Sequence, residues 1–291
     1  MHRFVLHNGE IHDAAVKDIA PGQTGFMNGW GVFSTIRVAN GVLFAWERHW
    51  ARMKHDAERM RVPFPSREDE LKSGLMRLIE ANDARDATLR VVVMRNHGGL
   101  FEGPSIDRKY DIVAFTTRLA DWGESVRLTI KTFARYAQNE FAGAKIASWA
   151  MNLAWYEEAH ERGFDEVILL NERGEVSELT SANIFAVQGK RVLTPPLSSG
   201  CLPGITRELL LDEVHADGIS VHEEVLIPPD LEEADEVFVT STTRDLLPVR
   251  FIEGLRVKHA SQTTEALRTA LCEYRENYIR RHAAATVETR A

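Results

Sequence analysis

Lys145 is the first residue whose surroundings suggest chemistry. It lies in the stretch FAGAKIASWAMN, residues 141–152, which contains no carboxylate, and the nearest acidic side chain is that of Glu140 just before it. Removing water from around an amine favours its neutral, nucleophilic form, which can form a Schiff base with a carbonyl compound. A lysine that runs along a loop into solvent is the structural alternative. The sequence therefore makes Lys145 a candidate nucleophile.

Glu178 is a candidate for an interior carboxylate. It lies in GEVSELTSANIF, residues 174–185, between two strand-like runs, and its neighbours are the small polar residues Ser177, Thr180, Ser181 and Asn183. Such groups can hold a carboxylate away from water, and a carboxylate that faces a pyridine nitrogen keeps that nitrogen protonated. A glutamate in a loop is the ordinary alternative.

The stretch CLPGITRELL, residues 201–210, predicts an anion site at the start of a helix. Gly204 allows close approach of the backbone, and Thr206 is expected to cap a helix over residues 206–216. The amides of Ile205 and Thr206 would then point at an anion such as phosphate. An ordinary helix cap explains the same residues.

A second loop rich in hydroxyl groups follows the strand-like run VFV. Residues 240–243 are Thr240, Ser241, Thr242 and Thr243, at the kind of strand end that often carries ligand loops. Hydroxyl groups there can bind phosphate oxygens, although a turn that bonds to its own backbone is an equal alternative.

Basic side chains elsewhere are candidates for binding anionic groups. Arg52 lies one helical turn after Arg48 and can direct a fork of donors at a phosphate. Arg37 and Arg95 are candidates for a substrate carboxylate, with a structural ion pair as the alternative. The candidate substrate contacts are Arg37, Arg95, His97 and Thr243.

The elements expected in the first region are those of a small mixed domain. Asn40 and Gly41 form a two-residue hairpin loop between two apolar runs. Ser66 is expected to cap the second of two helices. The predicted helices span residues 47–61 and 66–82, and the predicted strands span residues 88–95 and 111–118. The loop at 96–110 between the two strands has a length that is often functional.

The second region is expected to be larger and also mixed. We place a linker at residues 121–125 between a small domain, 1–120, and a large domain, 126–291. The predicted helices span residues 148–162, 206–216 and 261–280, and the predicted strands span 126–133, 165–170, 183–187, 191–194, 219–224 and 235–240. The fold class is therefore α+β.

Composition narrows the possible partners. With 35 basic and 43 acidic side chains among 291 residues, the net charge of −8 disfavours nucleic acid and anionic membranes. Cys201 and Cys272 are far apart, so neither a disulfide framework nor a zinc site is indicated. No apolar stretch is long enough for a membrane span or a signal sequence, which favours a cytoplasmic protein without metal.

The ordered set of these motifs resembles the fold type IV family of pyridoxal-phosphate (PLP) enzymes. This family, the class IV aminotransferases, includes branched-chain aminotransferases, D-amino acid aminotransferases and aminodeoxychorismate lyases. The resemblance covers about residues 4–260 and rests on NGE, GVFSTIR, ERHWARM, AKIAS, DEVILLNERGEVSELTSANIF, LPGITRELLL and DEVFVTSTTRDLLPV. It implies a two-domain architecture with a small N-terminal α/β domain and a larger, barrel-like C-terminal α/β domain.

The resemblance also implies roles for the candidate residues. Lys145 would hold PLP covalently, Glu178 would pair with its pyridine nitrogen, and Leu202 would pack against its ring. The phosphate would be bound by Arg52, Ile205, Thr206 and Thr242. Family members are homodimers that act on small amino acids and 2-oxo acids, which implies a homodimer here.

Departures from the family pattern leave the reaction open between alternatives. An ungapped comparison puts Leu89 and Val91 where branched-chain enzymes present a Tyr and an Arg to the substrate, and Ala150 where a Tyr bonds the cofactor, so that Trp149 or Asn152 would have to compensate. The leading hypothesis is an aminotransferase for an apolar amino acid, with branched-chain amino acids as candidates and ping-pong kinetics. The loop RNHGGLFEG, residues 95–103, is closer to the lyase branch, which releases pyruvate. A non-catalytic phosphate-binding protein is a third hypothesis, in which Lys145 and Glu178 would have no use.

Overall fold

The computed structural model describes residues 1–16, 19–20, 22–99 and 107–288, with side chains through residue 283. Two compact units are distinguished. Unit 1 comprises Met1–Ala120, Lys145–Trp149 and the chain from Tyr278 onward, and unit 2 comprises Asp121–Ala144 and Ala150–Asn277. The short segment Lys145–Trp149 thus belongs with the N-terminal part of the chain.

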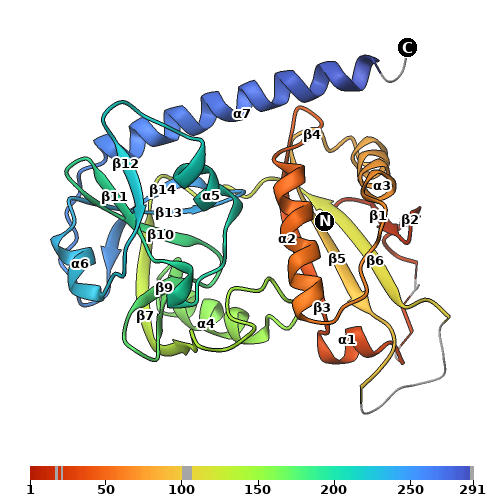
Figure 1. The fold of residues 1–291 in the computed structure, drawn as a ribbon, viewed down its shortest axis with the longest axis horizontal. Helices are drawn as coiled ribbons and strands as arrows, with labels where there is room; N and C mark the ends of the chain where they lie inside the picture. The colour runs from red at the N-terminus through yellow and green to blue at the C-terminus, as the bar shows by residue number, and fades with distance from the viewer. Residues whose placement is uncertain (17–18, 21, 100–106, 289–291) are drawn as a thin grey trace. The chain divides into compact units, whose positions relative to one another are not determined.

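Unit 1 is built on one antiparallel sheet with the order β2-β1-β6-β5-β3-β4. Its strands are β1 (Phe4–His7), β2 (Glu10–Asp13), β3 (Gly31–Ala39), β4 (Val42–Leu43), β5 (Ala87–Arg95) and β6 (Tyr110–Thr117). Its helices are α1 (Thr24–Asn28), α2 (Trp46–Arg59) and α3 (Glu68–Ala81). Both longer helices cover the sheet, with α2 along β3 and α3 beside β1 (Figure 1). Their apolar faces enclose a core that includes Ile36, Trp46, Leu75 and Leu89.

Most helices and strands predicted for unit 1 from the sequence begin and end within a few residues of the observed bounds. The Asn40-Gly41 hairpin is confirmed: both residues have positive φ, 50° and 78°, and Ala39 pairs with Val42 across the turn. The expected Ser66 cap is wrong, because α3 starts at Glu68 after Arg67 and has no side-chain cap. Three acidic residues in the first turn of α3 complement the helix dipole instead.

Asp111 of β6 is a buried carboxylate that connects several segments of unit 1. Its oxygens lie within hydrogen-bonding distance of five side chains: His7 Nε2 at 3.1 Å, Asn8 Nδ2 at 3.0 Å, Gln23 Nε2 at 2.6 Å, Asn96 Nδ2 at 3.0 Å and Arg108 Nε at 2.8 Å. Burial alone would raise the pKa of Asp111, but the bonds from Arg108, Asn8, Asn96 and His7 outweigh it and hold this pKa well below its usual range. The carboxylate therefore stays ionised and fixes the base of the loop 96–110.

Replacing Asp111 with asparagine should lower the free energy of unfolding by about 2–4 kcal/mol near neutral pH, because buried donors lose a charged acceptor. The folded-state pKa lies below the unfolded value of about 4, so this contribution is present above that pH and is lost as the pH falls through the folded-state pKa. Urea unfolding of wild type and variant should show a gap that narrows from about pH 7 to about pH 3. The exposed Asp107→Asn should match wild type, and an equal gap at both pH values would contradict the assignment.

Unit 2 contains a mixed sheet with the order β12-β11-β10-β13-β14-β7-β8-β9. Its strands are β7 (Val126–Arg135), β8 (Glu166–Asn171), β9 (Val176–Leu179), β10 (Asn183–Gln188), β11 (Arg191–Thr194), β12 (Ser220–Glu223), β13 (Glu236–Ser241) and β14 (Asp245–Ile252). Its helices are α4 (Ala150–Glu161), α5 (Ile205–Asp212), α6 (Pro228–Glu233) and the first part of α7 (Gln262–Glu288), with a 3₁₀ turn at Leu197–Ser199 (Figure 1). Buried aliphatic residues of β7, β8, β10, β13 and β14 form the core of this unit.

Two expectations for unit 2 need correction. Glu178 was expected between strands but lies in β9, whose four residues are all buried. Thr206 is not the cap of α5, since the helix starts at Ile205 after Gly204 and ends at Asp212. Within the described part of the chain, none of the helices combines the length and apolar character needed to cross a lipid bilayer.

Candidate active site

The backbone of Lys145 is held against the edge of β3 in unit 1. The amide of Phe33 donates to the Lys145 carbonyl at 3.1 Å, and the amide of Ala147 donates to the Gly31 carbonyl at 2.8 Å. Val32 and Ile146 form an isolated β-bridge between these contacts. The segment therefore extends the sheet beyond β3, and the lysine side chain starts from a fixed point.

The Lys145 amine and the Arg90 guanidinium both lie near the aromatic ring of Phe33. Lys145 Nζ lies 4.8 Å from the centroid of the Phe33 ring, and the Arg90 guanidinium carbon lies 3.9 Å from the same centroid. Trp149 meets Phe33 edge to face, with centroids 6.1 Å apart. Burial lowers the pKa of Arg90. Among the described residues, none accepts a hydrogen bond from Arg90 or forms an ion pair with it, so its fork of donors is available to a carboxylate.

Arg90, which lies between Leu89 and Val91, was not among the candidates from the sequence. Leu89 and Val91, which the ungapped comparison aligned with the substrate-binding positions, are fully buried in the core. Side chains alternate along a strand, so Arg90 between them emerges on the opposite face, where its strand partner is Thr35 of β3. A single arginine within the apolar run LRVVV was the available signal.

Arg52 is anchored by a buried hydrogen-bonded chain. Arg52 Nη2 donates to Ser34 Oγ at 3.0 Å, and Ser34 Oγ lies 2.7 Å from His49 Nδ1. Burial, followed by the charges of Arg52 and Lys145, lowers the pKa of His49 well below its usual value. A neutral His49 can accept a hydrogen bond from the Ser34 hydroxyl at Nδ1 while Ser34 Oγ accepts one from Arg52. This arrangement fixes one end of the guanidinium.

The two other arginines predicted to contact the substrate differ in their surroundings. Arg37 projects from the same face of β3 as Phe33, two pairs of residues further along. Arg95 instead donates to the carbonyls of Arg61 and His97 and stacks on Trp30 at 4.4 Å. This geometry favours a structural role for Arg95. Part of the loop 95–103, whose shape suggested a lyase, lies outside the described residues.

Glu178 is held by two donors in unit 2. Arg135 Nε donates to Glu178 Oε1 at 3.1 Å, and the amide of Leu202 donates to Glu178 Oε2 at 3.0 Å. Arg135 in turn donates to Asn152 Oδ1 at 3.3 Å, and Asn152 Nδ2 donates to the Thr180 carbonyl at 2.7 Å. Asn152, one of the two residues suggested to compensate for the absent Tyr, therefore helps to orient the partner of Glu178.

The start of α5 is shaped to receive an anion. No acceptor for the amides of Ile205 or Thr206 is found in the part of the chain that the structure describes. A Cβ atom on Gly204 would lie 2.0 Å from Asn183 Oδ1, so only glycine fits at this turn. Two free amides at a helix N-terminus beside a turn without side chain fit the phosphate of the expected cofactor.

Asn183 brings the two predicted phosphate loops of unit 2 together. Its side chain donates to the Leu202 carbonyl at 2.9 Å, and its backbone pairs with Thr240 across β10 and β13. Thr242 and Thr243 follow in the turn between β13 and β14 and are half-buried. Their hydroxyl groups form no hydrogen bond with any described residue, in contrast to Thr240, which donates to the Asp245 carbonyl at 2.5 Å.

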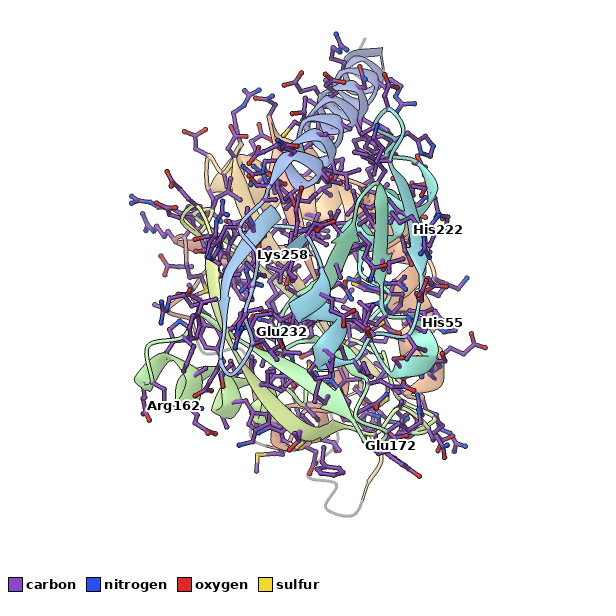
Figure 2. All side chains as sticks on the ribbon, turned by 90° about the vertical axis from the view of Figure 1, so that its left-hand side faces the viewer. His55, Arg162, Glu172, His222, Glu232 and Lys258 are labelled. Carbon is purple, nitrogen blue, oxygen red and sulfur yellow. The ribbon has the colours of Figure 1, made fainter. Side chains whose placement is uncertain are left out.

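Other charged residues of unit 2 are paired at its surface. Figure 2 labels Arg162 and Lys258, which form ion pairs with Glu253 and Asp235, respectively. Glu172, also labelled, accepts the amide of Ala137 at 2.8 Å. The partners of these three side chains lie within unit 2, so none of the three is a candidate for binding a ligand.

Comparison with known proteins identifies the family of this chain. The family described as "Amino-transferase class IV" matches residues 31–252. The chain is 28% identical to the branched-chain-amino-acid aminotransferase of Escherichia coli K12, covering 79% of this chain and 78% of that protein. It is also 28% identical to the D-alanine aminotransferase of Bacillus licheniformis, covering 92% and 95%.

A solved structure confirms the expected fold type. The crystal structure of Escherichia coli branched-chain amino acid aminotransferase superposes with a TM-score of 0.86 at 26% identity, covering 94% of this chain and 95% of that chain. Enzymes of this family depend on PLP, the cofactor that the sequence implied. The protein is therefore a member of the class IV aminotransferases and a PLP-dependent enzyme.

Proposed function

We propose that this enzyme transfers the amino group of an apolar amino acid, with branched-chain amino acids as the first candidates, to a 2-oxo acid in a ping-pong reaction. The observation that carries this proposal is the pairing of Lys145 Nζ and the Arg90 guanidinium on the ring of Phe33. An amine for proton transfer and a receptor for a carboxylate are the two groups that an amino acid substrate requires. The names of relatives such as the Escherichia coli enzyme support the branched-chain candidates.

We further propose which residues hold the cofactor. Lys145 binds PLP covalently, Glu178 faces its ring nitrogen, and Leu202 packs against its ring. The phosphate is bound by Arg52, Ile205, Thr206 and Thr242. The anchored guanidinium of Arg52, the available amides of Ile205 and Thr206, and the turn at Gly204 that excludes any side chain support this assignment.

Each proposed active-site side chain has a separate role in amino transfer. When bound, PLP withdraws electrons from the Cα of the amino acid and makes its proton acidic. Lys145 Nζ, once the substrate amine has displaced it from the cofactor, would be a free amine that can accept this proton and later give it back. Glu178 holds the proton on the ring nitrogen, and Arg90 orients the substrate through its carboxylate. The rings of Phe33 and Trp149 exclude water from an apolar substrate side chain.

A substrate panel tests the proposed function. We expect purified enzyme to form 2-oxo acids from leucine, valine or isoleucine with 2-oxoglutarate as acceptor, and to show parallel lines in double-reciprocal plots. D-alanine belongs in the panel because of the Bacillus licheniformis relative. Pyruvate release from aminodeoxychorismate without any acceptor would instead support the lyase, and no turnover with either set would contradict both.

Replacing Arg90 with alanine should raise KM for both the amino acid and the 2-oxo acid by about 10- to 100-fold, the loss expected for a charge-assisted contact. PLP affinity should stay close to wild type because Arg90 binds substrate alone. Arg90→Lys keeps the charge but loses the planar fork, so we expect an intermediate KM. Steady-state kinetics checks this, with the exposed Arg85→Ala as control. Unchanged KM values in Arg90→Ala would show that the carboxylate binds elsewhere.

We also propose that the enzyme is a homodimer. Large apolar side chains are exposed on unit 2 in two segments, 133–136 and 151–153, and the exposed fractions are 81% for Phe133, 59% for Tyr136, 66% for Met151 and 47% for Leu153. Exposed apolar groups that gather in short segments are typical of an interface. Light scattering at micromolar concentration should give twice the chain mass, and a lower mass for Phe133→Ser. A monomer in wild type would contradict the proposal.

A further inference from the structure

Helix α2 carries two buried polar residues one turn apart. Arg52 and Asp56 are 8% and 1% exposed, and residues four apart lie on the same face of a helix. Arg52 is assigned to the phosphate in the proposed function. Asp56 has no role in that assignment.

Asp56 contacts the residue at the centre of the proposed chemistry. Its Oδ2 accepts a hydrogen bond from the backbone amide of Lys145 at 3.0 Å. Its Oδ1 is buried without a hydrogen-bond partner in the described part of the chain. Burial raises the pKa of Asp56, and the bond from the Lys145 amide opposes this shift. Burying a carboxylate that accepts a single hydrogen bond costs folding free energy, so folding stability alone does not account for Asp56.

The bond completes the fixation of the Lys145 backbone. The Lys145 carbonyl is already bound by Phe33, and Ala147 is bound to Gly31, so the chain after Lys145 is fixed by β3. Asp56 fixes the chain on the other side, at the amide. With both sides held, the direction of the Cα–Cβ bond of Lys145 is fixed, and Nζ lies 4.8 Å from the centroid of the Phe33 ring. Pre-set geometry of this kind lowers the entropic barrier to a reaction.

We propose that Asp56 is a positioning residue for Lys145, acting through its hydrogen bond to the Lys145 amide. The inference rests on the proposed attachment of PLP to Lys145. That attachment joins Lys145 Nζ to the aldehyde carbon of PLP and releases the aldehyde oxygen as water. Pyridoxamine phosphate has an amine in place of the aldehyde, so it binds through phosphate and ring contacts without this bond.

The two cofactor forms therefore separate a positioning role from a structural one. Asp56→Ala should weaken PLP binding by about 10-fold, the effect of one hydrogen bond to a charged group, and pyridoxamine phosphate by less than about 3-fold. Asp56→Asn retains a carbonyl oxygen for the Lys145 amide and should restore most of the PLP affinity. Arg52→Ala should weaken both forms together because both carry the phosphate.

The test is a titration of cofactor-free, full-length protein with each form, followed by the absorbance of the bound cofactor. Two exposed residues of α2 provide matched controls, Glu58→Ala and His55→Ala. Figure 2 labels His55. Asp56→Glu gives a second test if Asp56→Ala fails to fold: it keeps the charge but displaces both oxygens by one methylene, and should also weaken PLP selectively.

Each outcome decides a separate question. An equal loss of both cofactor forms, or no loss, in Asp56→Ala and Asp56→Glu would overturn the role of Asp56. If borohydride reduction of wild type fixes no cofactor on Lys145, the proposed function fails before the variants are considered. A loss limited to PLP, restored by Asp56→Asn, is the result that the geometry predicts.

Discussion

Replacing Lys145 with alanine should lower the rate of amino transfer by about 10⁴-fold or more, because one side chain is assigned both the attachment of PLP and the proton transfer. The variant should still bind pyridoxamine phosphate, since the phosphate and ring contacts come from other residues. Its fold should be unchanged, because the backbone contacts of Lys145 with Phe33 and Asp56 do not involve the side chain. Steady-state assays with leucine and 2-oxoglutarate provide the measurement.

Chemical rescue sharpens this first prediction. Added small primary amines should restore part of the lost rate in Lys145→Ala, with a slope that follows the basicity of the amine, because they substitute for a proton carrier. Lys190→Ala, at a turn in unit 2, is a matched control and should match wild type. An activity of Lys145→Ala within 10-fold of wild type would show that another residue carries the chemistry.

Replacing Glu178 with glutamine should lower kcat by about 100- to 1,000-fold, the usual effect of losing one electrostatic group from an active site. In wild type, Arg135 and the Leu202 amide donate to different oxygens of Glu178. A glutamine has one amide oxygen and keeps one of these two bonds, and it carries no charge to hold a proton on the ring nitrogen. The withdrawal of electrons from Cα then weakens. KM should change little because Glu178 does not touch the substrate.

Exchange of the substrate Cα proton in deuterated water reports this effect directly by NMR. We expect the exchange rate to fall in parallel with kcat in Glu178→Gln and to stay near wild type in Glu157→Gln, an exposed glutamate of α4. Glu178→Asp keeps the charge at a shorter reach and should be intermediate. A large fall in kcat with normal Cα exchange would place the defect in a later step and remove Glu178 from this role.

Patterns of adjacent residues in the sequence predicted many of the turns and strands, including the turn at the start of α5. The Asn40-Gly41 turn is specified by two adjacent residues that tolerate positive φ. The strand at residues 191–194 was predicted with the bounds it has, because apolar residues and a turn delimit it. The turn at Gly204 was also predicted, since Pro203 and Gly204 precede a run of residues with a helical pattern. The error at Thr206 arose because the extended Gly204 takes the cap position itself.

Residues defined by strand register or tertiary contact were not predictable in the same way. A shift of one residue moves a strand side chain to the other face, so the ungapped comparison fell on the buried Leu89 and Val91 and passed over Arg90, which is proposed to bind the substrate carboxylate. Asp56 and Lys145 are 89 positions apart, and no local pattern connects them. Glu178 lies in the four-residue strand β9, which is too short to give a clear sequence pattern and pairs with β8.

The attachment of PLP to Lys145 is the central claim, and borohydride reduction tests it most directly. Purified protein is reduced in the presence of PLP, digested, and analysed by mass spectrometry for the modified peptide. The account predicts loss of the visible absorption band on reduction and a phosphopyridoxyl group on Lys145 alone. A protein that takes up no PLP, or a reduced adduct on a different lysine, would contradict it.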